Sequence, residues 1–293
     1  MSRIAYVNGR YVPLRQAAVH VEDRGYQFAD GVYEVCEVDG GRLIDERRHM
    51  DRLERSLKEL RIAMPMSRVA LGAVLRETVR RNRVGHGLVY LQVTRGVAPR
   101  NHLFPSPAVL PAIVVTARSS DAAAAERRAE AGVGVITVPE NRWARVDIKT
   151  VSLLPNVLAK QAAKEAGAYE AWFVDADGRV TEGGSTNAWI VTADGALVTR
   201  PAEEGILRGI TRTVLFDLAA EEGLKIEERA FTVEEAKAAR EAFITAATAV
   251  VMPVVRIDEV PLGNGAPGSI ATRLRSRFHD VAERSSLFAR PAG

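Results

Sequence analysis

One lysine of this sequence has surroundings that suit covalent chemistry. The chain has only six lysines among its 293 residues. Lys149 follows Asp147-Ile148 and precedes an apolar run that opens a helix, so we expect it at the end of an extended segment. A lysine amine in such a place can form an imine with a carbonyl compound and then shuttle a proton. By spacing alone, an ordinary salt-bridged lysine is the better interpretation of Lys149, and only the motifs that follow favour the reactive role.

Two further motifs follow it along the chain. Glu182-Gly183-Gly184-Ser185-Thr186-Asn187 places a carboxylate and two glycines before an apolar strand, and this carboxylate could pair with a protonated heterocycle nitrogen. Gly205-Ile206-Leu207-Arg208-Gly209-Ile210-Thr211-Arg212 runs directly into a helix, whose free amides and dipole favour a phosphate. Taken singly, the first motif also fits a hairpin exit and the second an ordinary capped helix.

A reactive lysine, a carboxylate and a phosphate site, in this order, are what a pyridoxal-phosphate enzyme requires. Together the three motifs resemble fold-type IV pyridoxal-phosphate enzymes, and the resemblance extends from about Tyr6 to Ala282. It implies that Lys149 forms the Schiff base, that Glu182 pairs with the pyridine nitrogen and that Leu207 packs on the ring. The phosphate contacts that it implies come from Arg52, Gly209, Ile210, Thr211, Ala247 and Thr248. Family members often carry a hydroxyl residue where Ala247 stands, which leaves Thr248, Thr211 and backbone amides to compensate.

The N-terminal half resembles one group of this family, the D-amino-acid aminotransferases. The resemblance rests on Gly31-Val32-Tyr33-Glu34-Val35 and on the segment from Gln92 to His102. It implies that Tyr33, Arg100 and His102 bind the substrate α-carboxylate, with Arg100 and His102 supplied by the other subunit of a homodimer. An arginine can bind a carboxylate through two parallel hydrogen bonds, which fixes its orientation.

The expected reaction transfers the amino group of a D-amino acid such as D-alanine to 2-oxoglutarate, giving pyruvate and D-glutamate by a ping-pong mechanism. Three alternatives keep the cofactor: a branched-chain L-amino-acid aminotransferase, an aminodeoxychorismate lyase and an (R)-amine transaminase. The Arg100 and His102 pair disfavours all three. A catalytically silent pyridoxal-phosphate-binding protein stays open as well.

Composition narrows the class of protein. No apolar stretch approaches the roughly 18 residues of a membrane span, and the N-terminus lacks the pattern of a secretory signal. The single cysteine, Cys36, cannot form an intramolecular disulfide, so we expect a cytoplasmic protein. The net charge of +3, with arginines interleaved among acids, argues against nucleic-acid binding. The scattered histidines predict no metal site.

The pattern along the chain predicts an α+β fold in two domains. Residues 1–120 are expected to form a small N-terminal α/β domain, and residues 121–293 a larger, barrel-like domain that binds the cofactor. Helices are predicted over 49–62, 67–83, 154–166 and 210–222, with Thr232 and Ser269 capping two more. Strands are predicted over 31–38, 88–95, 112–117 and 133–138, and turns at Asn8-Gly9, Asp177-Gly178 and Asp194-Gly195. Ser119–Glu130 is interpreted as a connector or an amphipathic helix.

Overall fold

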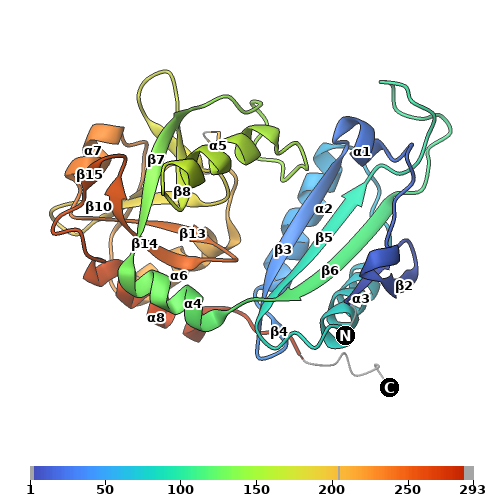
Figure 1. Cartoon of the computed structure of the whole chain (residues 1–293), viewed down its shortest axis with the longest axis horizontal. Helices are drawn as coiled ribbons and strands as arrows, with labels where there is room; N and C mark the ends of the chain where they lie inside the picture. Colours follow the sequence, from blue (N-terminus) through green and yellow to red (C-terminus); the bar gives the residue numbers. More distant parts are fainter. Residues whose placement is uncertain (1–2, 204, 287–293) are drawn as a thin grey trace. The chain divides into compact units, whose positions relative to one another are not determined.

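The structure, a computed structural model, describes residues 3–203 and 205–286. Two compact units divide them: residues 3–122, 148–152 and 283–286 form the first, and residues 123–147, 153–203 and 205–282 form the second. Each unit has its own sheet and its own helices, which confirms the predicted α+β class (Figure 1). The chain passes between the units more than once, since contacts group 148–152 and 283–286 with the first unit. A single domain boundary near Ser120 therefore stays a prediction.

The first unit is built on a six-stranded sheet in the order β2-β1-β6-β5-β3-β4, with all neighbours antiparallel. The strands are β1 (Ile4–Val7), β2 (Arg10–Pro13), β3 (Gly31–Asp39), β4 (Arg42–Leu43), β5 (Gly87–Thr94) and β6 (Ala112–Ser119). Along β3 every second residue is buried, as the predicted alternation required. The sheet therefore has one face covered by the core of the unit.

Helices α2 (Glu46–Glu59) and α3 (Arg68–Arg81) pack on this sheet (Figure 1). Both were predicted, and the hydroxyl of Ser67 caps α3 by accepting a hydrogen bond from the Ala70 amide at 3.3 Å. The short helix α1 (Arg24–Phe28) was not predicted. It begins at Asp23, whose carboxylate accepts from the Gly25 amide, and at five residues it is too short to show helical periodicity.

The second unit has a curled, mixed sheet whose main path is β12-β11-β10-β13-β14-β7-β8-β9, with β15 paired to β14. The strands are β7 (Val133–Pro139), β8 (Glu170–Val174), β9 (Val180–Gly183), β10 (Asn187–Val191), β11 (Leu197–Thr199), β12 (Ile226–Glu228), β13 (Glu241–Ala246), β14 (Val250–Ile257) and β15 (Val260–Pro261). The far end of the path curls back, because β9 lies next to β10. This curl brings the end of β9 to the middle of the sheet and produces the barrel-like form that was predicted.

Five helices complete this unit: α4 (Ala122–Ala131), α5 (Leu154–Glu165), α6 (Ile210–Glu221), α7 (Val233–Ala238) and α8 (Ser269–Val281). The Thr232 cap on α7 is confirmed, since its hydroxyl accepts from the Glu235 amide at 3.1 Å. The predicted Ser269 cap on α8 is wrong. The buried carboxylate of Glu241 takes that role by accepting from the amides of Ile270 and Ala271, both at 3.0 Å.

Candidate active site

Lys149 lies on a short extended segment of the first unit, beside the start of β3. The Tyr33 amide donates to the Lys149 carbonyl at 3.0 Å, and Thr150 forms an isolated bridge with Val32. Ile148 is 3% exposed and belongs to the hydrophobic core of this unit. Because side chains alternate along an extended chain, burying Ile148 and Thr150 turns Lys149 to the other face. This anchoring explains why a segment so late in the sequence belongs to the first unit.

The Lys149 amine lies over the ring of Tyr33, with Nζ 4.3 Å from the ring centroid. Tyr33 in turn stacks on Tyr90, with centroids 5.7 Å apart and an interplanar angle of 28°. Burial, together with nearby Tyr33, raises the pKa of Tyr90 to about 12, so its hydroxyl stays protonated and donates to Gln92 Oε1 at 2.7 Å. The predicted base and the predicted carboxylate-binding tyrosine are thus direct neighbours.

Arg52, the predicted phosphate ligand on α2, is held by a buried carboxylate. Its Nε and Nη2 atoms donate to the two oxygens of Glu34, each at 2.8 Å, and His49 Nδ1 lies 2.7 Å from the same carboxylate. Burial raises the pKa of Glu34, but the charge and hydrogen bonds of Arg52 and His49 lower it far below its usual value. Burial lowers the pKa of His49 despite its contact with Glu34. The guanidinium of Arg52 is therefore fixed in direction before any ligand arrives.

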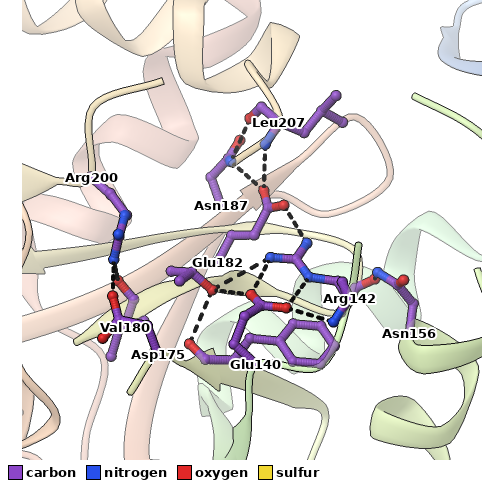
Figure 2. A network of polar contacts seen from close by, with 12 residues as sticks. Glu140, Arg142, Asn156, Asp175, Val180, Glu182, Asn187, Arg200 and Leu207 are labelled. Carbon is purple, nitrogen blue, oxygen red and sulfur yellow. Dashed lines mark hydrogen bonds and ion pairs between the residues drawn. The ribbon is translucent and has the colours of Figure 1, made fainter. Parts of the chain in front are cut away.

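Glu182, at the end of β9 in the second unit, lies in a dense polar network (Figure 2). One carboxylate oxygen accepts from Arg142 Nη1 at 2.5 Å, and the other accepts from Asn187 Nδ2 at 3.0 Å and from the Leu207 amide at 3.1 Å. The Glu182 and Arg142 side chains are only 6% and 5% exposed. This buried ion pair favours the charged carboxylate, the form that can hold a proton on a heterocycle nitrogen.

Arg142 is itself clamped by a second carboxylate (Figure 2). Its Nε and Nη2 atoms donate to the two oxygens of Glu140 at 2.9 and 2.6 Å, and Thr181 Oγ1 donates to Glu140 at 2.8 Å. The guanidinium also lies over the ring of Phe173, 4.5 Å from its centroid. Burial acts to lower the pKa of Arg142, but the hydrogen bonds and charges of Glu140 and Glu182 raise it overall. The cation beside Glu182 is thus permanent.

The start of α6 has the features of an anion site. Gly209 is its N-cap residue, and neither a side-chain cap nor an acidic residue satisfies the first-turn amides, which include those of Ile210 and Thr211. A Cβ atom on Gly209 would lie 2.0 Å from Asn187 Oδ1, so only glycine permits this approach. The Asn187 amide also donates to the Leu207 carbonyl at 2.9 Å. One side chain therefore ties the Glu182 carboxylate to the helix start, an arrangement that fits a cofactor with a ring nitrogen and a phosphate.

Ala247 and Thr248 lie in the turn between β13 and β14. Thr248 is exposed, whereas Thr245, the last hydroxyl residue before them, accepts a hydrogen bond from the indole of Trp189 at 3.1 Å. The phosphate roles of Ala247 and Thr248 stay predictions.

Arg100 and His102 lie on a long exposed segment of the first unit, residues 97–111, which we call the carboxylate loop. Both side chains contact the ring of Phe28: the Arg100 guanidinium lies 4.9 Å from its centroid, and the His102 ring centroid lies 5.3 Å away. Within residues 3–203 and 205–286, no hydrogen bond, ion pair or ring contact joins either side chain to Tyr33. In the described part of the first unit, Tyr33 and the Arg100–His102 pair are therefore not in direct contact.

Several partners of the predicted residues were not foreseen from the sequence: Glu34, His49, Glu140 and Arg142. The only available signal was a charged residue in an apolar stretch, such as Glu34 in an otherwise half-buried strand. The structure describes no group of three or more His, Cys, Asp or Glu side chains that could hold a metal ion in the parts of the chain it covers. Among the described helices, none combines the length and the apolar character needed to cross a membrane.

Comparison with known proteins identifies relatives over nearly the whole chain. The model of the amino-transferase class IV family matches residues 31–257. A D-alanine aminotransferase of Bacillus licheniformis is 42% identical, over 93% of this chain and 95% of its own length. A D-alanine aminotransferase of Staphylococcus haemolyticus is 39% identical, over 96% of this chain and 98% of its own length.

Among solved structures, a branched-chain amino acid aminotransferase of T.th. with pyridoxamine 5'-phosphate superposes with a TM-score of 0.87. It is 27% identical to this chain, and the match covers 96% of this chain and 94% of that one. The fold is therefore shared with branched-chain enzymes, whereas the sequence is more similar to the D-alanine enzymes. The family match and the full-length relatives together show that this chain belongs to the class IV aminotransferases.

Proposed function

We propose that this chain is a pyridoxal-phosphate-dependent aminotransferase that moves the amino group of a D-amino acid, such as D-alanine, to a 2-oxo acid, such as 2-oxoglutarate. The observation that carries the proposal is the identity of about 40% to D-alanine aminotransferases over nearly the full length of both chains. The alternative of a branched-chain enzyme rests on structural similarity at 27% identity, which reflects a fold common to the family.

The residues of the second unit suit the two ends of the cofactor. When bound, pyridoxal phosphate supplies an electron sink that stabilises negative charge at the substrate α-carbon. Glu182 would hold the proton on the ring nitrogen, supported by the permanent cation of Arg142. The amides at Gly209–Thr211 would bind the phosphate at the start of α6. Thr248 and the backbone at Ala247 would add further phosphate contacts, and Leu207 would pack against the ring.

The residues of the first unit suit proton transfer and carboxylate binding. Lys149 would hold the cofactor covalently through Nζ until the amine of the substrate takes its place. The freed Nζ would then accept the proton from the substrate α-carbon and deliver it to the carbon of the cofactor that carries the amino group. Its place over the Tyr33 ring supports this role, because a carboxylate bound at Tyr33 would bring the α-carbon close to Nζ. Arg52, fixed by Glu34, would be a further phosphate ligand.

A homodimer accounts for the lack of contact between Tyr33 and the side chains of Arg100 and His102. We infer that Arg100 and His102 act on the substrate bound by a second copy, since neither contacts Tyr33 within the described first unit. Large apolar side chains on and near the loop support such an interface, because they are strongly exposed in the single chain. They are Val21, Tyr26, Leu103 and Leu110, at 71%, 75%, 74% and 88% exposure.

The cytoplasm is the location that we propose, since Cys36 is a buried free thiol and the sequence offers no second cysteine for a disulfide. The partners implied are small amino and 2-oxo acids.

The test is to titrate the pyridoxal-phosphate-loaded protein separately with D-alanine and with L-leucine while following the visible absorbance of the cofactor. We expect a spectral change with D-alanine only, and formation of pyruvate and D-glutamate when 2-oxoglutarate is added. A change with L-leucine alone would instead place the chain among the branched-chain enzymes. Pyruvate release from aminodeoxychorismate without 2-oxoglutarate would favour the lyase, and no change with any of them would indicate a silent binding protein.

A further inference from the structure

The carboxylate loop is anchored to its own unit by a buried cluster of charges around Asp30. Arg24 Nε donates to Asp30 Oδ2 at 2.8 Å, and Arg95 donates to both Asp30 oxygens at 2.7 and 2.9 Å. The three side chains are 4%, 12% and 9% exposed, in the order Arg24, Asp30, Arg95. Charged groups are buried at this level only when they are paired, so the cluster is a fixed part of the fold.

Both arginines reach from this cluster to the loop. Arg24 Nη1 donates to the carbonyl of Asn101 at 2.5 Å, and Asn101 is the residue between Arg100 and His102. The Arg95 guanidinium lies 3.7 Å from the ring centroid of Phe104, further along the loop. The loop is therefore held on both sides of His102, through its backbone at Asn101 and through the side chain of Phe104, although the segment is exposed.

Phe28, the last residue of α1, contacts the side chains of Arg100 and His102, which the contacts at Asn101 and Phe104 leave free to rotate. Arg24, Arg100 and His102 all contact its ring, with the two guanidinium carbons 4.8 and 4.9 Å from the centroid. A ring face favours a guanidinium over it and restricts a side chain that would otherwise move freely in solvent. Phe28 thus keeps Arg100 and His102 next to each other.

The other charged groups near the loop are paired with one another, so the Arg100 guanidinium is available to bind an anion. Arg24 and Arg95 share the single carboxylate of Asp30, whereas Arg100 forms no ion pair with any residue that the structure describes. Nearby Asp23 is engaged as well, since it caps α1 and accepts from Thr94 Oγ1 at 2.9 Å. The loop therefore carries an excess of positive charge at its one uncommitted guanidinium.

We propose that Asp30, Arg24 and Phe28 are positioning residues that hold Arg100 and His102 ready to bind the substrate α-carboxylate. Asp30 orients Arg24, Arg24 fixes the loop backbone at Asn101, and Phe28 aligns the two side chains. The inference rests on the proposed function, because it assigns the loop to carboxylate binding. Preorganisation of this kind lowers the entropy lost when the substrate is bound.

Two variants test the proposal: Arg24→Lys and Phe28→Leu. Lysine keeps a positive charge near Asp30 but lacks the fork needed to reach both Asp30 and Asn101. Leucine keeps apolar bulk but offers no ring. We expect KM for D-alanine to rise roughly 10- to 100-fold in Arg24→Lys, as for the loss of a hydrogen bond to a charged group, with a smaller change in kcat. In Phe28→Leu we expect a rise of about 2- to 5-fold, as for the loss of a cation–ring contact at an exposed site. Cofactor absorbance and content should match those of the unsubstituted protein.

Tyr11→Leu is the matched control. Arg81 lies over the Tyr11 ring at 4.3 Å in the same unit, so this variant removes an equivalent cation–ring contact that is remote from the loop. Its KM should stay unchanged. Unchanged KM values in both Arg24→Lys and Phe28→Leu would overturn the proposal, and so would a loss of cofactor in step with the loss of substrate binding.

Limited trypsin digestion separates this inference from the proposed function. Arg24→Lys keeps the number of tryptic sites, and we expect faster cleavage of the Arg100–Asn101 bond in that variant. If the unsubstituted protein does not act on D-alanine, the proposed function fails, and the cleavage rate then decides whether Arg24 anchors the loop. An equal cleavage rate in the variant and the unsubstituted protein would refute the anchoring.

Discussion

Removal of Arg142 should destabilise the second unit more than removal of any exposed arginine. In Arg142→Met, the 6% exposed carboxylate of Glu182 and the 21% exposed carboxylate of Glu140 lose their common cation. Removing one partner of a buried ion pair costs about 3–5 kcal/mol, because an uncompensated charge is left behind. Glu140 can turn partly to solvent, so we expect the lower half of this range.

The magnitude can be measured by thermal unfolding of the protein without cofactor. A loss of about 3–4 kcal/mol corresponds to a fall in Tm of roughly 6–16 °C for a unit of this size. Arg179→Met is the control, since its ion pair with Asp177 has side chains 51% and 72% exposed and is worth about 1 kcal/mol or less. The double variant Arg142→Met with Glu182→Gln should recover part of the loss, because no unpaired charge remains at position 182.

Activity offers a second readout of the same substitution. Without Arg142, the Glu182 carboxylate loses the hydrogen bond at 2.5 Å that fixes one of its oxygens. Transamination by the cofactor-loaded variant should therefore fall, because the carboxylate that would face the ring nitrogen is no longer held in place. Equal stabilities of Arg142→Met and Arg179→Met, together with equal transamination rates for Arg142→Met and the unsubstituted protein, would refute the role given to this ion pair.

Three other predictions follow from single contacts. The first unit should lose stability as the pH falls below about 6.5, the usual pKa of histidine, because burial lowers the pKa of His49 in the folded state and the unfolded chain binds the proton first. In His49→Gln, the free energy of unfolding measured with urea should depend less steeply on pH between about pH 5 and 6.5. Gly209→Ala should cost about 1–3 kcal/mol and weaken phosphate binding, since the new Cβ meets Asn187 Oδ1 at 2.0 Å; unchanged affinity for pyridoxal phosphate by equilibrium dialysis would contradict this. Glu241→Ala should lower the free energy of unfolding by about 1–2 kcal/mol, because two buried amides of α8 lose their acceptor, and Glu234→Ala on the charged surface of α7 is the comparison.

The sequence was sufficient for features that depend on neighbouring residues. The alternation of β3, the cap at Thr232 and the Gly-rich start of α6 are all local patterns, and the structure contains each of them. The short helix α1 and the cap on α8 were missed for a shared reason. The five residues of α1 are too few to show helical periodicity. The α8 cap is supplied by Glu241, which lies 29 residues before Ile270, the residue whose amide donates to it.

The same limit applies to the candidate site. Lys149, Glu182 and the residues at Gly209–Thr211 lie in recognisable motifs, but the groups that set their charge and direction come from elsewhere in the chain. Arg142 is 40 residues from Glu182, and Glu34 is 18 residues from Arg52. These pairings form only when strands and helices pack against each other, so composition and spacing did not predict them. The domain arrangement shows the same effect, since Ile148 draws the Lys149 segment into the core of the first unit.

The separation of two polar networks in the molecule has a consequence for how substrate binding can change in such an enzyme. The Glu182–Arg142–Asn187 network, which would govern the electronic state of the cofactor, shares no residue with the Asp30 cluster and the carboxylate loop. Substitutions in groups that share no partner act nearly independently on stability. Mutation of the loop can therefore change how firmly the substrate α-carboxylate is held while the groups around the cofactor ring keep their contacts. In such an enzyme the strength of substrate binding can vary without a change in the residues that would set the charge of the ring.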